Sequence, residues 1–423
     1  MEKEILDSKK STLEQTPRAI RKHIVIAGNT NSGKSTLLNA LCDQEVALIS
    51  NIKGTTTDPV YKNIELRGVG AVTLVDTAGF GDDTKLGEKR LMATREALKK
   101  ADVILLVLED NLEESSKLYF ELSEYETPII PVYNLREIAE YEKIEQNKSS
   151  KLEKFSEVST FSFDNEIKKF KSAIFADDII AVNAKTGAGI DALLQKLSVL
   201  LKEEEVFITR NLVKRGDSVL LVMPQDIQAP KGRLILPQVQ TIRELLDRGC
   251  IVSCVTTDSF RDALNNIKNV DLVITDSQAF KIVDEILPKE VRLTSFSVLF
   301  AGYKGDIGAF IEGAKAIDSL NKNSRVLIAE ACAHAPSEED IGRVKIPALL
   351  KKKYGDMHID FVRGVDFVDE DSNYDLIIHC GGCMFNSKYM MNRLKLTDKL
   401  NIPMTNYGIT IAKLAGILDR VVY

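Results

Sequence analysis

Short apolar runs alternate with helical patterns along most of the chain. Between residues 22 and 205 the apolar runs are HIVIAG, AVTLVDTAG, ADVILLVLED, TPIIPVYN and IIAVNA, and amphipathic segments such as STLLNALCD lie between them. Strands that alternate with helices are joined by right-handed crossovers, which build a mostly parallel sheet covered on both faces. This part of the chain is therefore predicted to form an α/β domain with a doubly wound sheet.

Two further blocks repeat the alternation. The first contains SVLLVMP, CIVSCVT and DLVITD, and the second contains RVLIAEA, MHIDFV, YDLIIH and IPMTNYG. We therefore expect three consecutive α/β domains, at residues 1–205, 206–293 and 294–423. A stretch rich in Lys, Glu and Ser between residues 134 and 179 is expected to be a solvated insertion. The Pro- and Gly-containing loop QDIQAPKGRLILPQ is long enough to reach a partner, such as a second copy of the chain.

Composition narrows the classes of partner. The chain has 56 Lys and Arg against 62 Asp and Glu, and its net charge of −6 gives no global attraction for nucleic acid or for an anionic membrane. No apolar run approaches the roughly 18 residues that span a bilayer, and the first twenty residues lack a secretory signal. A cytoplasmic protein is expected. In a reducing compartment its six cysteines are core thiols, catalytic groups or metal ligands rather than disulfides.

The segment GNTNSGKST follows the strand HIVIA and begins a helix, which is the context of a phosphate-binding loop. Lys34 is expected at the β and γ phosphates and Ser35 at a magnesium ion. In DTAG, Asp76 would hold the magnesium shell and the Gly79 amide would sense the γ phosphate. Thr56, in GTTTD, is the candidate switch hydroxyl that closes on magnesium. The expected phosphate-loop residues are Gly28, Asn29, Asn31, Ser32, Gly33, Lys34, Ser35 and Thr36.

These motifs resemble the translation-factor-related GTPases, in the branch of the TrmE and Era proteins. The resemblance implies GTP and Mg²⁺ as ligands, and it implies that Asn31 ligates a potassium ion supplying the charge otherwise given by an arginine finger. Phe80 stands where Ras-like enzymes carry the glutamine that orients the attacking water. Slow intrinsic hydrolysis is therefore expected.

The base-reading segments differ from the pattern of that family, which is Asn-Lys-x-Asp. Here the segment after a predicted strand runs from Asn134 to Glu137, and Glu137 is one methylene longer than the usual aspartate. Its carboxylate can still accept two hydrogen bonds from the guanine edge. The loop of Asn183, Ala184 and Lys185 resembles the last guanine-contacting loop of the family. GTP therefore remains the expected nucleotide.

Rare residues gather at the ends of two predicted strands in the third block. Cys332 follows RVLIAEA, and Cys380 and Cys383 follow YDLIIH. The two clusters hold half of the six cysteines and, with His334 and His379, half of the four histidines. Ends of parallel strands meet at the carboxyl edge of a sheet, where open α/β sheets bind ligands. A metal site is therefore predicted at this edge.

Three thiolates and a histidine fit two kinds of metal site. One is a closed, structural zinc site with Cys3His ligands. The other is a 4Fe-4S cluster in which three cysteines bind three irons and the fourth iron takes a histidine, a carboxylate or an exchangeable group. Gly381 and Gly382 leave amides free to approach sulfide, which favours the cluster slightly. The candidate fourth ligands are His334, His379, Glu338 and Glu339.

A GTPase domain followed by Cys-x-His, a gap of 44 residues and His-Cys-x-x-Cys resembles the HydF family of FeFe-hydrogenase maturation GTPases. The segments LTSFSVLFAGYKGD and TNYG also look like that family. The resemblance covers nearly the whole chain. It implies a GTPase domain, a dimerisation domain and a cluster-binding domain in a homodimer or a higher oligomer.

The resemblance also implies a scaffold or carrier role. A di-iron subcluster built with radical-SAM hydrogenase maturases would be held by this protein and then delivered to the apo FeFe-hydrogenase. The alternative is a regulatory TrmE/Era-like GTPase with a structural zinc site. An RNA-processing role is disfavoured by the acidic balance and by the lack of an aromatic-rich basic stretch.

Overall fold

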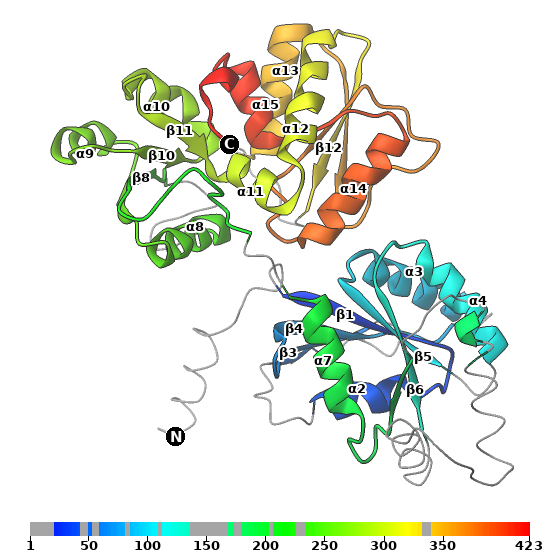
Figure 1. The fold of residues 1–423 in the computed structure, drawn as a ribbon. Coiled ribbons are helices and arrows are strands. Elements are labelled where there is room, and N and C mark those ends of the chain that lie inside the picture. Colours follow the sequence, from blue (N-terminus) through cyan, green and yellow to red (C-terminus); the bar gives the residue numbers. More distant parts are fainter. Residues whose placement is uncertain are drawn as a thin grey trace, which may run out of the picture. The chain divides into compact units, whose positions relative to one another are not determined.

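The computed structural model describes most of the chain in two compact units. The described residues are 21–42, 50–52, 59–80, 85–108, 112–135, 168, 170–172, 179–202, 206–225, 234–331 and 340–423. The units are Met1–Glu203 and Glu204–Tyr423. No helix in these ranges is both long enough and apolar enough to cross a bilayer. Each unit is described by itself (Figure 1).

The first unit contains a seven-stranded sheet in the order β2-β3-β4-β1-β5-β6-β7 (Figure 1). Strands β4, β1, β5, β6 and β7 are parallel, whereas β2 and β3 pair antiparallel at one side. The mostly parallel sheet that the apolar runs predict is therefore present. The strand bounds are β1 Lys22–Ala27, β2 Ser50–Ile52, β3 Val60–Leu66, β4 Gly70–Asp76, β5 Val103–Leu108, β6 Ile129–Asn134 and β7 Ile180–Val182.

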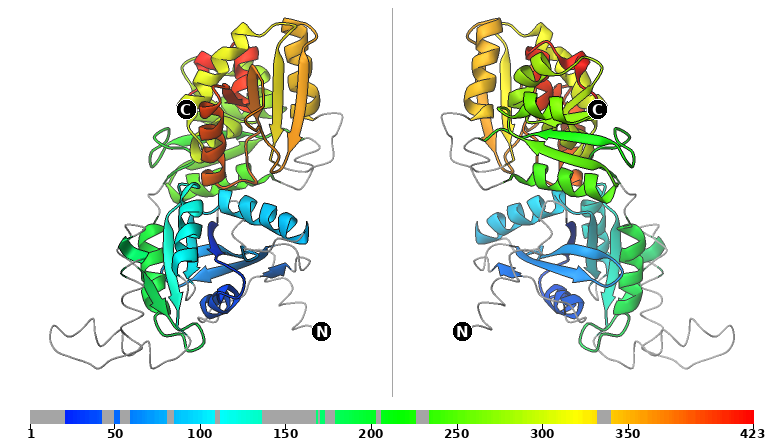
Figure 2. Two further views of the ribbon diagram at one scale, coloured as in Figure 1. Left: turned by 90° about the vertical axis from the view of Figure 1, so that its right-hand side faces the viewer. Right: turned by 90° about the vertical axis from the view of Figure 1, so that its left-hand side faces the viewer.

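Helices cover both faces of this sheet, and Figure 2 shows α2 and α3 on opposite sides of it. Strand β1 alternates, with Ile24 and Ile26 in the core under α2 and α7, and Val25 and Ala27 in the core under α3 and α4. Burial on both faces explains why the central strands are continuous apolar runs. The helix bounds are α2 Lys34–Cys42, α3 Lys85–Lys99, α4 Leu112–Ser123 and α7 Ile190–Leu200.

The predicted insertion contributes to the core of this unit. Most of residues 136–178 lie outside the described residues. Phe170 is described and is 1% exposed, and its ring packs edge to face on Tyr119 with centroids 6.3 Å apart. The insertion therefore is not purely a solvated excursion, because at least one of its aromatic rings is buried.

The second unit contains two parallel four-stranded sheets, in the orders β11-β10-β8-β9 and β13-β12-β14-β15. Both have the strand order of a small doubly wound α/β fold. Their strands are β8 Ser218–Val222, β9 Ile251–Val255, β10 Leu272–Thr275, β11 Arg292–Ser295, β12 Arg325–Glu330, β13 His358–Arg363, β14 Leu376–His379 and β15 Met404–Asn406. The predicted α/β fold class is thus confirmed in both units.

One hydrophobic core joins the two sheets of the second unit. Leu220 and Val273 of the β8–β11 sheet belong to the same buried cluster as Val326 and Ile377 of the other sheet. The predicted boundary between residues 293 and 294 falls inside strand β11. The helices are α8 Leu236–Asp247, α9 Phe260–Asn266, α10 Phe280–Ile286, α11 Phe296–Lys304, α12 Ile307–Ala314, α13 Ile346–Tyr354, α14 Ser387–Lys399 and α15 Tyr407–Leu414.

The chain end closes one side of the β8–β11 sheet. Val421 forms a parallel bridge with Leu293 of β11, and the Val422 amide donates to the Leu293 carbonyl at 2.8 Å. Strand β9 is the opposite edge of that sheet, and its Ile251 is 62% exposed. The two edges therefore differ, because the residues after α15 cover only β11.

Close backbone packing fixes α12 against β15. A methyl group at Gly313 would overlap the carbonyl oxygen of Met404, which is part of the backbone and has little freedom to move. We predict that Gly313→Ala lowers the free energy of unfolding of the second unit by about 2 kcal/mol through overpacking. Urea unfolding followed by circular dichroism measures this change.

Gly308→Ala is the matched control, because Gly308 lies on the same helix and is exposed. Alanine favours a helix over glycine by up to about 1 kcal/mol. A methyl group there would lie 3.1 Å from Oδ1 of Asp306, a side-chain atom rather than backbone, so we expect a smaller change in stability than for Gly313→Ala. Equal losses in both variants would show that the contact of Gly313 with β15 is not the cause.

Candidate functional site

The phosphate-binding loop connects β1 to α2 in a conformation that requires glycine. Gly28 and Gly33 have φ values of 153° and 99°. A methyl group on Gly28 would lie 2.8 Å from the Val107 carbonyl oxygen, and one on Gly33 would lie 2.8 Å from Nδ2 of Asn134. Asn31, the predicted potassium ligand, also has a positive φ of 66°. The loop thus packs tightly between β5 and the predicted base-reading asparagine.

Lys34 and Ser35 begin α2 and point to the predicted phosphate and magnesium positions. The Lys34 ammonium is buried and donates to the Gly28 and Asn29 carbonyls, at 3.1 and 2.6 Å. Ser35 donates to Oδ2 of Asp76 at 2.7 Å, so the structure brings together these two predicted magnesium residues. Oδ1 of Asp76 is buried and accepts no hydrogen bond from the described residues.

The electrostatics of Asp76 fit a cation. Burial raises the pKa of Asp76, while the hydrogen bond from Ser35 and the charge of Lys34 oppose that shift. A carboxylate that is half-desolvated and has a buried oxygen without a donor is stabilised by a bound metal ion. Gly79 packs on this site as well, because a methyl group there would lie 2.5 Å from the Thr30 amide nitrogen. The chemistry of these residues fits Mg²⁺, which Ser35 and Asp76 would hold.

The base-reading loops are tied together by asparagine side chains. Oδ1 of Asn134 accepts the Ala184 amide at 3.0 Å, and Oδ1 of Asn183 accepts the Lys185 amide at 3.1 Å. Leu135, which replaces the usual lysine of the motif, is 4% exposed and so packs inward. The predicted site residues Thr56 and Glu137 lie outside the described residues. The two described segments that are predicted to read the base are therefore joined by the contact of Asn134 with Ala184.

The thiol site lies at the carboxyl edge of the second sheet of the C-terminal unit. Strands β12 and β14 are parallel neighbours, with Ala329 opposite His379. The Cys380 amide donates to the Ala329 carbonyl at 2.9 Å, and the Ala331 amide donates to Sγ of Cys380 at 3.0 Å. The two strand ends therefore lie side by side, as the sequence predicts. The other predicted ligands lie outside the described residues, namely Cys332, His334, Glu338 and Glu339.

His379 is buried beneath this edge, and both of its ring nitrogens are engaged. Nδ1 lies 2.7 Å from the Cys380 carbonyl oxygen, and Nε2 lies 2.8 Å from Nη1 of Arg393. A guanidinium only donates, so Nε2 accepts and Nδ1 donates. Burial, with the charge of Arg393, lowers the pKa of His379 to about 3, which keeps the ring neutral. This geometry favours a supporting role for His379 over its predicted role as a fourth ligand.

Lys304, at the end of α11, closes the thiol site from the interior. It is 3% exposed, and its Nζ donates to the carbonyls of Gly382, Cys383 and Phe385 at 3.2, 3.1 and 2.6 Å. Burial lowers the pKa of Lys304 to about 8, against the effect of the nearby Cys383 and Cys380. Lys304 is therefore still mostly protonated at pH 7. Burial raises the pKa of Cys380 to about 11, so its thiol is protonated without a bound metal.

Sequence reasoning missed both buried cations. Arg393 is 3% exposed and occupies the buried face of α14 with Tyr389, Met390 and Leu394. Lys304 ends the apolar helix SFSVLFAGYK. A single charged residue at a position of the helical pattern that is otherwise apolar is the signal that could have identified each of them.

A buried carboxylate paired with two half-buried arginines anchors the chain on both sides of residues 332–339. Glu330 ends β12 and is 9% exposed, and its Oε2 accepts from Arg343 at 2.9 Å and from Arg363 at 3.2 Å. Arg343 follows the segment that begins with Cys332, and Arg363 ends β13. Removing one partner leaves the other charge poorly solvated, so it costs more folding free energy than removing one partner of an exposed pair. Glu330 therefore fixes the position at which this segment leaves the sheet.

The donor set fits an iron–sulfur cluster in its chemistry. Cys380 and Cys383 follow one strand, and Gly382 between them has a left-handed φ of 62°, which lets the chain turn between the two thiols. Within the described ranges, no three His, Cys, Asp or Glu side chains converge as a metal site. The third predicted thiol, Cys332, lies outside them. The described geometry thus supplies two thiols of the expected set.

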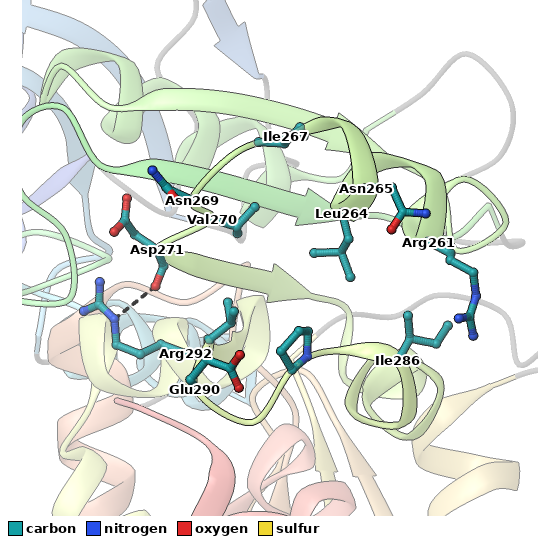
Figure 3. A pocket seen from close by; sticks show the side chains of 12 residues that line it. Arg261, Leu264, Asn265, Ile267, Asn269, Val270, Asp271, Ile286, Glu290 and Arg292 are labelled. Carbon is teal, nitrogen blue, oxygen red and sulfur yellow. Dashed lines mark hydrogen bonds between the residues drawn. The ribbon is translucent and has the colours of Figure 1, made fainter.

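A hollow of about 630 Å³ lies elsewhere in this unit, between the ends of α9 and α10 (Figure 3). Its apolar wall includes Leu264 and Ile286. Among the polar groups that line it, Arg292 is used within the fold, because it donates to the carbonyls of Asp271 and Leu212. It lies at the amino edge of the β8–β11 sheet, where α/β folds seldom place a site.

The fold and these sites define a P-loop GTPase domain joined to a second α/β unit that carries a thiol site. A family model described as 50S ribosome-binding GTPase matches residues 23–135. Models of the hydrogen maturase F dimerization domain and tetramerization domain match residues 208–305 and 308–423, which together are 214 of the 423 residues. The chain belongs to the hydrogen maturase F family.

Curated GTPases are similar to about half of the chain. The tRNA modification GTPase MnmE of Buchnera aphidicola is 31% identical over 53% of this chain and 46% of its own length. GTPase Der of Nautilia profundicola is 32% identical over 45% of this chain and 37% of its own. The chain thus spans less than half of these relatives. The structure of Aquifex aeolicus Era bound to GDP and AlF4⁻ aligns with 62% of this chain and 97% of that chain, at 19% identity and a TM-score of 0.32.

The contacts of Lys34 predict a severe catalytic defect when the side chain is removed. Lys34→Ala deletes the ammonium at the phosphate loop, and we expect GTP hydrolysis to fall about 100-fold or more. Phosphate release from GTP under saturating Mg²⁺ measures the rate. Lys117→Ala, at an exposed lysine of α4, is the control and should keep the wild-type rate. Hydrolysis by Lys34→Ala within threefold of the wild type would contradict the assignment.

Proposed function

We propose that this protein is a GTP-dependent carrier in FeFe-hydrogenase maturation. Its thiol site would hold a 4Fe-4S cluster through Cys332, Cys380 and Cys383. The observation that supports this most directly is the hydrogen bond from the Ala331 amide to Sγ of Cys380. Ala331 precedes Cys332 in the chain, so two thiol-bearing segments start from one corner of the sheet. Family membership gives this corner its context.

The cargo follows from the coordination that three cysteines can provide. A cluster held by three thiolates leaves one iron for a further ligand, which supplies a place to hold an iron-containing group. We propose that a di-iron subcluster precursor is accepted there from radical-SAM hydrogenase maturases and delivered to the apo FeFe-hydrogenase. The fourth ligand would come from His334, Glu338 or Glu339, because the described contacts of His379 occupy both its nitrogens.

The GTPase domain would control this transfer through nucleotide state. Lys34, Ser35, Asp76 and Gly79 would position the phosphates and Mg²⁺, and Thr56 would close on the metal as a switch. Asn31 would ligate K⁺. The guanine base would be read by Asn134, Glu137, Asn183, Ala184 and Lys185. The buried Oδ1 of Asp76, which accepts no hydrogen bond from the described residues, supports the metal part of this assignment.

Oligomerisation would use the free edge of the β8–β11 sheet. Models of a dimerization and a tetramerization domain match this chain, which indicates a homodimer or a higher oligomer. At the edge strand β9, Ile251 is 62% exposed, and Val239 and Leu246 of the adjacent α8 are 47% and 51% exposed. An unpaired edge with exposed apolar residues is a template for pairing with a second strand. We propose that a second copy of the chain binds there.

Electron paramagnetic resonance tests the cluster assignment. Anaerobically reconstituted, dithionite-reduced wild-type protein is expected to give a reduced-cluster signal, and Cys380→Ser should lose it or alter it strongly. Cys254→Ser, at an exposed cysteine in the other sheet, should keep the signal. Iron and acid-labile sulfide are measured on the same samples. Stoichiometric zinc without sulfide in the wild type would contradict the proposal and favour a structural zinc site.

Charge on the edge strand should break the proposed pairing. Ile251→Arg places a cation at the start of edge strand β9. We expect the molar mass in sedimentation equilibrium to fall to half of the wild-type value at micromolar concentration. Ile282→Arg is the control, because Ile282 is also about half exposed, at 50%, but lies on helix α10 and not on the edge strand. An unchanged mass for Ile251→Arg would place the interface elsewhere.

A further inference from the structure

A buried cation lies directly behind the loop between Cys380 and Cys383. Lys304 comes from α11, which is far from this loop in the sequence but packs on α14 beside it. Its ammonium donates to three carbonyls of the loop, those of Gly382, Cys383 and Phe385. All three protons of the ammonium are therefore used on the segment that carries the thiols.

The surroundings of Lys304 leave its charge uncompensated by any described carboxylate. Its hydrogen-bond partners are neutral carbonyls, and the ionisable groups that interact with it among the described residues are Cys380 and Cys383. A buried charge is costly unless an opposite charge lies nearby. The thiols supply that opposite charge only as thiolates, which is the form in which cysteine binds a metal.

A neutral side chain could hold these carbonyls at a lower cost. An amide or a hydroxyl donates hydrogen bonds without the desolvation of a charge. Hydrogen bonding alone therefore does not account for a lysine that is 3% exposed at this position. A lysine is explained if the neighbouring thiol site carries negative charge when it is loaded.

We propose that Lys304 is a positioning residue of the thiol site, which fixes the Cys380–Cys383 loop and stabilises the negative charge that this site carries when it is loaded. The inference rests on the proposed function, since it needs an iron–sulfur group at these thiols. Reduction adds one negative charge to the site. The Lys304 ammonium therefore favours the reduced state, and its removal lowers the reduction potential.

Three substitutions separate charge from hydrogen bonding. Lys304→Met keeps the length of the side chain and removes both, Lys304→Gln keeps donors without charge, and Lys304→Arg keeps both. Full-length protein is reconstituted anaerobically, and its midpoint potential is measured by a mediated redox titration read by electron paramagnetic resonance. Iron and sulfide are measured per chain. Lys352→Met, at an exposed lysine of α13, controls for the loss of one positive charge at the surface.

We expect the midpoint potentials of Lys304→Met and Lys304→Gln to lie about 59 mV below the wild-type value. For a one-electron couple, this shift means about a tenfold lower ratio of reduced to oxidised cluster at the wild-type midpoint. Lys304→Arg and Lys352→Met should keep the wild-type potential. The test does not depend on whether Lys304→Met folds, because Lys304→Gln and Lys304→Arg also compare a neutral with a charged side chain.

Two results would overturn the inference. In the first, Lys304→Met and Lys304→Gln bind a full cluster and keep the wild-type midpoint potential, which would show that the charge has no effect on the site. In the second, the potential shifts in Lys304→Met but not in Lys304→Gln, which would show that only the hydrogen bonds of Lys304 contribute. Failure of the proposed function is read separately, from wild-type protein that binds no iron and sulfide.

Discussion

The parallel pairing of β12 with β14 is the constraint on which the C-terminal site depends. Its register sets Ala329 opposite His379, so the chain leaves both strands at one height and Ala331 reaches Sγ of Cys380. A slip of one residue would turn His379 from the interior to the other face and break its bond with Arg393. The buried core of this sheet therefore determines where the thiols lie.

The strands of both units follow from apolar runs, because central strands of parallel sheets are buried on both faces. Every apolar run that the sequence analysis identified forms a strand, from β1 to β15. The phosphate loop is equally local, since glycines and a helix start specify it. Strand β11 was missed because its sequence RLTS has one strongly apolar residue. Its burial comes from the chain end and the second sheet, which no local pattern reports.

The sequence indicates candidate ligands for the thiol site, whereas the side chains that support this site could not be predicted from it. Spacing and rarity identify Cys380 and Cys383, whereas Lys304 is 78 residues away from Gly382 in the sequence. Its burial depends on how α11 packs on the loop. The prediction for His379 shows the same limit. Its chemistry suits a ligand, but its tertiary contacts with Arg393 and Cys380 occupy both nitrogens. Residue type indicates what a side chain can do, and packing decides which of those roles is open.

The two lysines at the two sites are held in the same way. Lys34 is 7% exposed and donates to the Gly28 and Asn29 carbonyls of the phosphate loop, and Lys304 is 3% exposed and donates to carbonyls of the thiol loop. In each case a loop at the carboxyl edge of a parallel sheet encloses an ammonium that donates to backbone carbonyls. For a phosphate loop this arrangement stores positive charge for an anionic ligand. The same physical argument applies to Lys304, with thiolates in place of phosphates.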